Sequence, residues 1–466
     1  MARVVVVGGG ISGLTTALAL ADALAERVAD GDVTVEVRER AERSGGKLSA
    51  SPFAGLPAVD EGADAFLARS PDAVALAHRV GLGDDLTSPT GARAAVWFDR
   101  LHDLPDGLLL GVPTDALRLV TSRLLTVRGR ARAALEPLLP SRGDPDDSIG
   151  ALIRARFGNE VHERLVDALV GSIYGADTDR FSLTMVPQLS ALHDRGRSLL
   201  LAGRSLRAQA PPPSGPTFLT PKGSMAALAA ATATAATAAG ATVRRGAPVG
   251  AVARDGDRWR VDGDAVEAVV FATPAAATAP MLAGAVPDAA MVLAAMDHAG
   301  VAIVTLAVPN WPERLRGRSG YLVPKPVQRT VTAASFGSQK WAHWPSPAGE
   351  VVRVSLGRDG LPVDHLDDDT LVDRALAEVG THLGLDLQPA AIRVSRWPAA
   401  FPQYRPHHPN WVAAVERTLP AGLFVTGASY RGIGVPACVA DAARTAGEVA
   451  SLLAGATARA DGRLRG

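Results

Sequence analysis

The feature that most restricts the fold of this 466-residue chain is its opening stretch, in which four valines run directly into three glycines. The β-branched residues Val4–Val7 predict a short strand that is buried on both faces. The next residues, Gly8, Gly9, Gly10, Ile11, Ser12 and Gly13, fit the pattern G-x-G-x-x-G, and helical spacing begins at Leu14. The order strand, tight turn, helix is typical of a dinucleotide-binding unit, whose pyrophosphate lies at the positive end of the helix.

A second strand and an acidic residue support this interpretation. Val33–Val37 alternates as a strand should, and Glu39 follows it. An acidic side chain at the end of the second strand accepts hydrogen bonds from an adenosine ribose. The spacing from the glycines to Glu39 exceeds the usual value, which predicts a lengthened helix and loop between them. A glycine-rich turn that only packs a helix on a sheet is the alternative, and the acid makes it the weaker one.

Length and composition set limits on the organisation and on partners. A chain of this length predicts two or three domains of about 100–200 residues each. The 48 basic and 48 acidic residues balance, so no overall charge favours nucleic acid. A single cysteine, Cys438, excludes an intrachain disulfide and favours the cytoplasm. The alanine-rich run 226–241 is too short and polar to span a bilayer, so we expect no integral membrane insertion. Peripheral membrane contact remains open, as does a monomer or a homodimer.

The pattern along the chain predicts an α/β protein whose first domain is assembled from distant segments. The last 45 residues repeat the opening order of strand, glycine-rich turn and helix, while the middle of the chain is rich in helical signals. We expect a Rossmann-like FAD-binding domain, a mixed-sheet substrate domain and an inserted helical domain. The expected segments are 1–65, 217–290 and 410–466 for the first, 66–90 and 291–409 for the second, and 91–216 for the insert.

The residues after the second strand narrow the family. The stretch from Glu39 to Lys47 reads E-x-x-x-R-x-G-G-K, with Arg43 and the pair Gly45-Gly46 in the middle. It resembles the extended motif of flavoprotein oxidases related to amine oxidases, phytoene desaturases and protoporphyrinogen oxidase. Because that motif binds FAD in those families, the resemblance implies FAD and not NAD as the cofactor.

Three further stretches resemble the porphyrinogen oxidase branch of these flavoproteins, which includes bacterial coproporphyrinogen III oxidases and protoporphyrinogen IX oxidases. They are "VDEGADAFLARSPDAVALAHRVGLGDDL" (59–86), "LVGSIYGADTDRFSLTMVPQL" (169–189) and "TGASYRGIGVPACVADAARTA" (426–446). The chain departs from the branch pattern at Ser172, which replaces a glycine, and at Phe181, which replaces a leucine. It also has Ala428 where many relatives have aspartate.

The resemblance assigns residues to the cofactor. Glu39 would bind the ribose, Arg43 and Lys47 would lie beside the diphosphate or the flavin, and Val249 would meet the adenine through its backbone. The closing turn would lie under the isoalloxazine ring, where a helix dipole stabilises negative charge on the reduced flavin. The full expected set is Gly8, Gly9, Gly10, Ile11, Ser12, Gly13, Glu39, Arg40, Arg43, Gly46, Lys47, Gly62, Ala63, Asp64, Ala65, Val249, Gly427, Ile433, Gly434 and Val435.

The resemblance also implies a reaction, the oxidation of coproporphyrinogen III to coproporphyrin III in heme biosynthesis, with O2 as acceptor and H2O2 as product. The preferred substrate residues are Arg69, as a carboxylate clamp, and Ile173 and Tyr174, as a wall for the macrocycle. Each has a plain alternative, a surface arginine or ordinary core. Tyr404 is either substrate-facing or core. We expect no metal site, and no residue is assigned as catalytic, because the cofactor carries the electronics.

Rival functions stay open at this point. The principal alternative is a protoporphyrinogen IX oxidase or a flavin amine oxidase. Amine oxidases commonly carry a lysine near the flavin on a strand of the substrate domain, and the matching stretch 298–308 has none. They also flank the amine with paired aromatic rings, and Tyr430 is the one candidate here. A phytoene desaturase would favour a more hydrophobic tunnel, and a non-enzymatic docking protein would keep an inert flavin.

Overall fold

The opening valines form the centre of a parallel sheet to which both ends of the chain contribute. The computed structural model describes residues 1–140, 144, 147–209, 215–256 and 258–464, with the side chains described up to residue 455. Five parallel strands lie in the order β12-β2-β1-β16-β22. Their bounds are β1 Ala2–Val7, β2 Val33–Arg38, β12 Thr242–Arg244, β16 Ala268–Phe271 and β22 Leu423–Val425. This sheet confirms the predicted doubly wound architecture.

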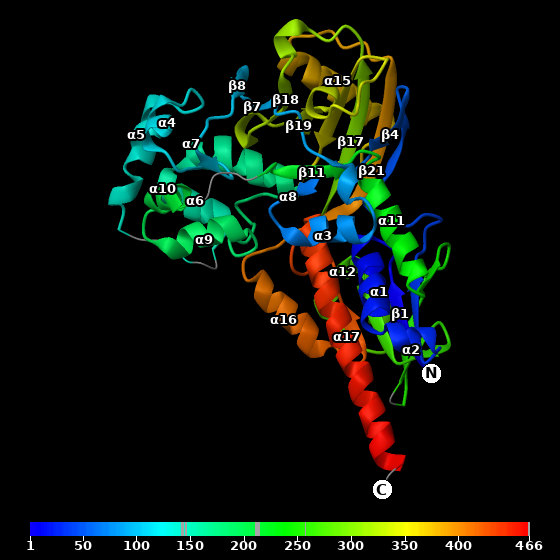
Figure 1. Ribbon diagram of the computed structural model, residues 1–466. Helices are drawn as coiled ribbons and strands as arrows, with labels where there is room; N and C mark the ends of the chain where they lie inside the picture. The colour runs from blue at the N-terminus through cyan, green and yellow to red at the C-terminus, as the bar shows by residue number, and fades with distance from the viewer. Residues whose placement is uncertain (141–143, 145–146, 210–214, 257, 465–466) are drawn as a thin grey trace.

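Helices from both ends of the chain cover one face of this sheet. The first helix packs against the last one and against a helix from the middle of the chain, so three distant segments share one apolar core (Figure 1). These helices are α1 Ile11–Ala23, α17 Val435–Leu464 and α11 Met225–Ala238. The remaining elements of this lobe are α2 Ala25–Ala29, β13 Val252–Asp255, β14 Arg258–Val261, β15 Asp264–Val266, α12 Ala275–Leu282, α13 Pro287–Ala294 and α16 His408–Thr418.

A second lobe is built on a seven-stranded mixed sheet in the order β21-β17-β20-β19-β18-β7-β8. The strands are β7 Arg93–Trp97, β8 Leu101–Asp103, β17 His298–Val308, β18 Arg318–Leu322, β19 Val331–Phe336, β20 Glu350–Leu356 and β21 Ala391–Pro402. The amphipathic helix α15 (Asp368–Leu383) covers it, with Asp367 as the N-terminal cap that accepts from the Thr370 amide. Its short helices are η4 Glu313–Leu315, η5 Lys325–Val327 and α14 Gly337–Lys340.

Small sheets join the two lobes. The strand β11 (Phe218–Pro221) pairs with β5 (Phe66–Leu67) and with β6 (Leu86–Thr87), so segments that we assigned to different domains form one sheet. The other connecting elements are β3 Ala50–Phe53, β4 Leu56–Asp60, α3 Pro71–Arg79 and η1 Gly83–Asp85.

The third lobe is the helical insert, on the left in Figure 1. Its elements are β9 Leu108–Leu109, β10 Val112–Pro113, α4 Ala116–Thr121, α5 Val127–Ala134, η2 Glu136–Leu138, α6 Ile149–Phe157, α7 Asn159–Val161, η3 His162–Gly171, α8 Ser172–Tyr174, α9 Pro187–Arg195 and α10 Leu199–Gln209. The boundary predicted at residue 91 is too early. Residues 93–103 form β7 and β8 of the seven-stranded sheet, because β7 pairs with β18, more than 200 residues later, and local sequence carries no signal for such a partner.

Parts of the predicted segments lie outside the described residues, namely 141–143, 145–146 and 210–214 of the insert, 257 of the FAD-binding domain, and the last two residues. Within the part of the chain that the structure describes, no helix has both the length and the apolar character needed to cross a bilayer.

Candidate functional site

The turn between β1 and α1 is tight because Gly13 has no side chain. A Cβ atom at Gly13 would collide with the carbonyl oxygen of Gly8, which has a φ of +105°. The helix α1 starts after Gly10 without a capping side chain and without an acidic residue in its first turn. Its positive N-terminus is therefore left for a ligand anion.

The loop after β2 lies directly on this turn. Glu39 accepts from the Gly9 amide at 2.6 Å and from the Ala41 amide at 2.9 Å. The Gly45 amide donates to the Gly9 carbonyl at 2.7 Å, and Arg43 holds the loop by donating to the Gly46 carbonyl at 2.8 Å. The sequence-predicted residues of the two motifs thus meet at the carboxyl ends of β1 and β2, where doubly wound folds bind ligands.

Two further predicted residues flank this loop. The stretch before Val249 runs beside Glu39, because the Ala247 amide donates to the Glu39 carbonyl at 2.8 Å. Arg40 is exposed and has no hydrogen bond or ion pair within the described residues. The adenosine end of a dinucleotide would therefore have both a carboxylate and a free cation within reach.

The closing turn meets the opening helix. The Gly427 amide donates to Asp441 at 3.0 Å, and a Cβ at Gly427 would lie 3.3 Å from the Ser12 hydroxyl oxygen. Buried aromatic side chains hold the backbone of this turn from behind: the Tyr404 hydroxyl donates to the Ala428 carbonyl, and His408 Nε2 donates to the Tyr430 carbonyl at 2.9 Å. Tyr404 is therefore a core residue of this turn.

The N-terminus of α17 completes that side. Ile433, Gly434 and Val435 lead into α17, which has no acidic residue in its first turn. Cys438 follows in the same turn of helix, where burial raises the pKa of its thiol to about 11. A second uncompensated helix N-terminus thus faces the region between the lobes.

The segment Gly62–Ala65 approaches from the other side. A Cβ at Gly62 would lie 2.6 Å from the Lys47 carbonyl oxygen, so this segment borders the second motif. The Asp64 carboxylate points away from it, since it accepts from Lys340 at 2.8 Å and from the Trp341 indole at 3.1 Å. Burial by itself would raise the pKa of Asp64, but the positive charges of Lys340 and Arg353 hold it well below its usual range. The backbone of this segment, and not the Asp64 carboxylate, is what a cofactor would meet.

The residues that hold this segment were missed by sequence reasoning. Arg353 donates to the Gly62 carbonyl and pairs with Asp64 at 3.1 Å. Asp60 accepts from the Met225 amide at 2.9 Å, and burial raises the pKa of its carboxyl to about 7. Each partner lies more than 160 residues from Asp60 or Asp64 in sequence, and no local pattern marks them.

Together these elements border a solvent-accessible space, the hollow between the lobes. Gly46, Lys47, Ala63 and Gly434 are exposed, although the elements that carry them converge from both lobes. Lys47 Nζ donates to the Ala400 carbonyl across this space, and burial lowers its pKa to about 8. Lys47 is therefore accessible to solvent and at the same time surrounded by protein atoms. A Cβ added at Gly10 would meet no atom within 4 Å, so this glycine also borders open space.

The hollow fits FAD. It offers two helix N-termini without carboxylates for negative charge, a carboxylate at the ribose end and Lys47, whose ammonium has no carboxylate partner within the described residues. A diphosphate would supply the negative partner that the Lys47 ammonium lacks.

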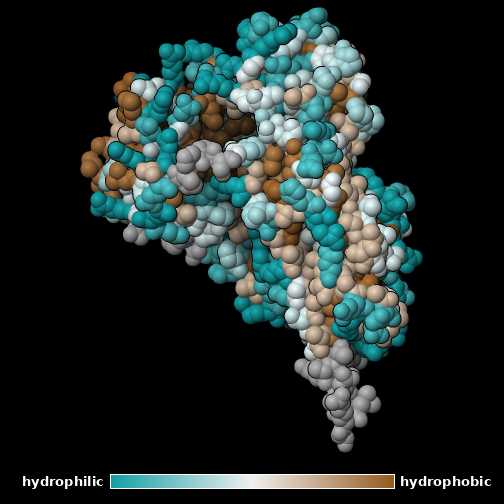
Figure 2. All heavy atoms as spheres, viewed as in Figure 1, coloured by the Kyte–Doolittle hydropathy of each residue, from teal (hydrophilic) through white to brown (hydrophobic). Residues whose placement is uncertain are grey.

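The three candidate substrate residues also come together. Arg69 is exposed and makes no hydrogen bond or ion pair within the described residues. Burial raises the pKa of the neighbouring Tyr174, and the charge of Arg69 opposes that rise. Ile173 is 46% exposed, although it is a large apolar residue. Figure 2 shows a hollow with apolar walls between the insert and the lobe of the seven-stranded sheet.

The two departures from the branch pattern in this region have structural explanations. The Ser172 hydroxyl donates to the Ala168 carbonyl at 2.7 Å, inside the helix. Phe181 is fully buried, and its ring lies 4.9 Å from that of Tyr174 and 5.5 Å from that of Tyr404. Ser172 therefore lies inside the helical segment that carries Ile173 and Tyr174, and Phe181 packs against Tyr174.

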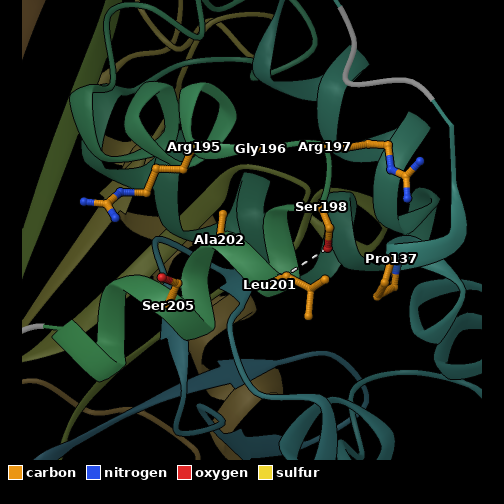
Figure 3. A pocket seen from close by; sticks show the side chains of 8 residues that line it. All are labelled: Pro137, Arg195, Gly196, Arg197, Ser198, Leu201, Ala202 and Ser205. Atoms are coloured by element: carbon orange, nitrogen blue, oxygen red, sulfur yellow. Dashed lines mark hydrogen bonds between the residues drawn. The ribbon is translucent and has the colours of Figure 1, made fainter.

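A separate pocket opens on the insert, at the N-terminus of α10 (Figure 3). Its arginines, Arg195 and Arg197, point in opposite directions. The α10 amides are already bound, because Glu136 accepts from Leu199 at 2.9 Å and Ser198 accepts from Leu201 at 3.1 Å. This pocket therefore lacks the open helix N-terminus that α1 offers.

Comparison with known proteins identifies the family of this chain. The family model of flavin containing amine oxidoreductases matches residues 11–450. The chain is 34% identical over 463 residues to the coproporphyrinogen III oxidase of Mycobacterium tuberculosis (strain H37Rv), covering 97% of this chain and 98% of that protein. It is 27% identical to the coproporphyrinogen III oxidase of Bacillus subtilis, covering 94% of this chain and 95% of that protein.

A solved structure has the same architecture. The crystal structure of an Exiguobacterium sp. protein named for protoporphyrinogen oxidase superposes with a TM-score of 0.84, at 26% identity, over 96% of this chain and 98% of that one. This agreement covers all three lobes, the insert included.

Proposed function

This chain belongs to the family of flavin containing amine oxidoreductases and is an FAD-dependent enzyme, and we propose that it oxidises coproporphyrinogen III to coproporphyrin III. The observation that supports the proposal most strongly is the exposed Arg69 guanidinium, which has no ionic partner within the described residues and lies close enough to Tyr174 to oppose the rise in its pKa, with the exposed Ile173 next to Tyr174 in the chain. A porphyrinogen is a broad apolar macrocycle with carboxylate side chains, and an unpaired arginine is suited to bind a carboxylate in bidentate fashion.

The reaction that we propose balances as coproporphyrinogen III plus three O2 giving coproporphyrin III plus three H2O2. When bound, FAD accepts two electrons in each cycle, so three cycles complete the oxidation. The protein holds and orients the reactants: Glu39 and the α1 N-terminus bind the adenosine diphosphate part, and Lys47 supplies a buried positive charge. Arg69 would bind a propionate, and Ile173 would lie against the macrocycle.

The principal alternative substrate is protoporphyrinogen IX, which has two propionates in place of four. The relatives named coproporphyrinogen III oxidase favour coproporphyrinogen III as the substrate, whereas the similar solved structure is named for protoporphyrinogen oxidase. An amine substrate is less well supported. Tyr430 is only 1% exposed and stacks on Trp411, so it offers no free ring to flank an amine.

The experiment is a comparison of substrates. The purified yellow protein is mixed with coproporphyrinogen III, protoporphyrinogen IX or a polyamine under oxygen, and porphyrin fluorescence and H2O2 are followed. We expect three H2O2 per porphyrin and a higher kcat/KM for coproporphyrinogen III. Inert flavin with both porphyrinogens, or turnover of the polyamine alone, would contradict the proposal. Arg69→Ala should raise KM about tenfold, whereas Arg79→Ala, which removes an exposed arginine paired with Asp22 at 2.7 Å, should leave it unchanged.

We also propose a peripheral surface role for the insert and a cytoplasmic location, which the buried and unpaired Cys438 supports. Large apolar side chains are exposed at the outer end of the insert, beside several arginines: Leu117, Val120, Val127, Leu135, Leu138 and Leu201. Exposed apolar residues with cationic neighbours suit the surface of an anionic membrane. Sedimentation with anionic vesicles, but not with neutral ones, is the expected result. Equal recovery in the supernatant with both vesicles would contradict it.

A further inference from the structure

The insert is tied to the seven-stranded lobe by a band of ion pairs around residues 167–180. One of these pairs is almost completely removed from solvent: the side chain of Asp167 is 0% exposed and that of Arg358 is 5% exposed. The other pairs in the band have at least one partner that is more accessible: Lys325–Asp177, Lys325–Asp179 and Arg180–Asp359. The Asp167–Arg358 pair is therefore the most buried of these ion pairs between the two lobes.

Several hydrogen bonds fix the side chains of this pair. Both guanidinium nitrogens of Arg358 donate to Asp167, each at 2.8 Å. The Thr178 hydroxyl donates to the same carboxylate at 2.6 Å, and Arg358 also donates to the Ala176 carbonyl. Burial alone would raise the pKa of Asp167, but the hydrogen bonds and charge of Arg358 lower it, so the pair stays ionised. A bidentate pair of this kind fixes direction as well as distance.

Asp167 lies within η3, which is a π-helix of ten residues. The π-helix is rare, usually a single turn, and is often found at functional sites. In a π-helix each carbonyl is bonded by the amide five residues later and not four. The Ser172 hydroxyl donates an additional hydrogen bond to the Ala168 carbonyl. The π-helix ends at Gly171, two residues before Ile173. Arg358 holds both Asp167, upstream of this wall, and Ala176, downstream of it.

We propose that Asp167 and Arg358 are positioning residues for the oxidation of the porphyrinogen, and that their ion pair sets the place of Ile173 and Tyr174 relative to the flavin. The inference rests on the proposed function. The pair touches neither the substrate nor the cofactor in this assignment. It acts through the short stretch that it clamps at both ends, because a misplacement of about 1 Å in a positioning wall is enough to lower a rate strongly.

The chain contains a matched control. Glu136 and Arg156 form a second buried ion pair, with 0% and 1% of their side chains exposed and a distance of 2.6 Å. Both of these residues belong to the insert, so their pair crosses no boundary between lobes. Removing either pair takes away two buried charges, but of the two pairs only Asp167–Arg358 joins the insert to the other lobe.

The experiment compares two neutral double variants of the full-length holoenzyme, Asp167→Asn with Arg358→Gln and Glu136→Gln with Arg156→Gln. Flavin content is measured first, from the ratio of flavin to protein absorbance, and we expect it to be unchanged in both. The anaerobic rate of flavin bleaching by coproporphyrinogen III is expected to fall at least twentyfold in the first variant. It should stay within twofold of the wild-type rate in the second. Binding of coproporphyrin III, followed by fluorescence, is expected to weaken at least fivefold in the first variant alone.

Amide hydrogen exchange gives a measure that does not depend on activity. Residues 171–178 should exchange at least tenfold faster in the first variant and at the wild-type rate in the second. The conservative variant Arg358→Lys keeps the positive charge but cannot make the bidentate hydrogen bonds to Asp167, so its exchange rates and bleaching rate should be intermediate.

Three outcomes overturn the proposal: wild-type bleaching in the first variant, equal slowing in both variants, or unchanged exchange over residues 171–178. Failure of the wild-type protein to bleach with any porphyrinogen is a different result. It removes the proposed function and the catalytic role of the pair together, while the exchange measurement still decides whether the pair holds the segment.

Discussion

The N-termini of α1 and α10 both present backbone amides that could bind an anion, but the protein treats the two ends differently. At α1 no side chain caps the helix and no carboxylate lies in its first turn, so the amides face the hollow between the lobes. At α10 the amides are bound by Glu136 and Ser198, which are themselves linked at 2.5 Å. A helix end that the protein satisfies internally serves stability, and one that it leaves open serves a ligand.

The pocket beside α10 shows why a concave surface with arginines is not sufficient. Its two arginines diverge, and the buried carboxylate has already taken the positive helix end (Figure 3). In the hollow between the lobes, the N-termini of α1 and α17 carry no carboxylate in their first turns. Lys47 adds a positive charge that has no carboxylate partner within the described residues. Four predictions test this contrast, from the largest expected effect to the smallest.

The largest effect is expected at the turn before α1. The variant Gly13→Ala places a Cβ against the Gly8 carbonyl oxygen, where the backbone has no room to give way. We expect a loss of more than about 4 kcal/mol in the free energy of unfolding, because a steric clash in the core of the fold is among the severest single changes. Urea unfolding and flavin content measure the result. A stable yellow protein would show that this turn is looser than the contacts indicate.

The next effect is expected at α10. The variant Glu136→Ala leaves Arg156 buried without its carboxylate and releases the α10 amides. We expect the insert to lose about 3–5 kcal/mol of stability, the usual result of breaking a buried ion pair on one side. Thermal unfolding, followed in the presence of saturating FAD, measures it. If stability is unchanged, then the α10 end is not satisfied internally and the contrast with α1 fails.

A smaller and more selective effect is expected at Gly10. Its φ of −73° suits any residue, and a Cβ there meets only open space. The variant Gly10→Ala should therefore unfold like the wild type, while its dissociation constant for FAD rises at least tenfold, or about 1.4 kcal/mol. Titration of the apoprotein with FAD, paired with urea unfolding, separates the two quantities. Unchanged FAD affinity would place the diphosphate elsewhere.

The smallest effect is a pH dependence of FAD binding. Burial lowers the pKa of Lys47 to about 8, and a bound diphosphate must raise it again, so binding takes up a proton above pH 8. Affinity for FAD should therefore fall about fivefold between pH 7 and pH 9.5. The variant Lys47→Met should bind more weakly at pH 7 and show no such decline. A decline of the same size in both proteins would assign the proton to another group.

Local patterns in the sequence were sufficient for the cofactor half of the molecule. Val4–Val7, the glycines and Glu39 lie within one βαβ unit, where short-range sterics and periodicity decide the structure. The same holds for α15, whose acidic start and apolar spacing predict the helix that is observed. These features could be read without knowing any distant partner.

The chain alone therefore determined that both ends build one parallel sheet, that the turn after β1 is tight, and that a positive helix end is left open. Only the tertiary structure decided which charges meet. Asp167 finds Arg358 191 positions away, and Asp64 finds Lys340 276 positions away. It also showed that the Asp64 carboxylate is taken up by Lys340 and Arg353 and that β7 joins the second lobe. The physical reason is that a buried charge is stable only with its partner, and the fold, not the neighbouring sequence, brings that partner.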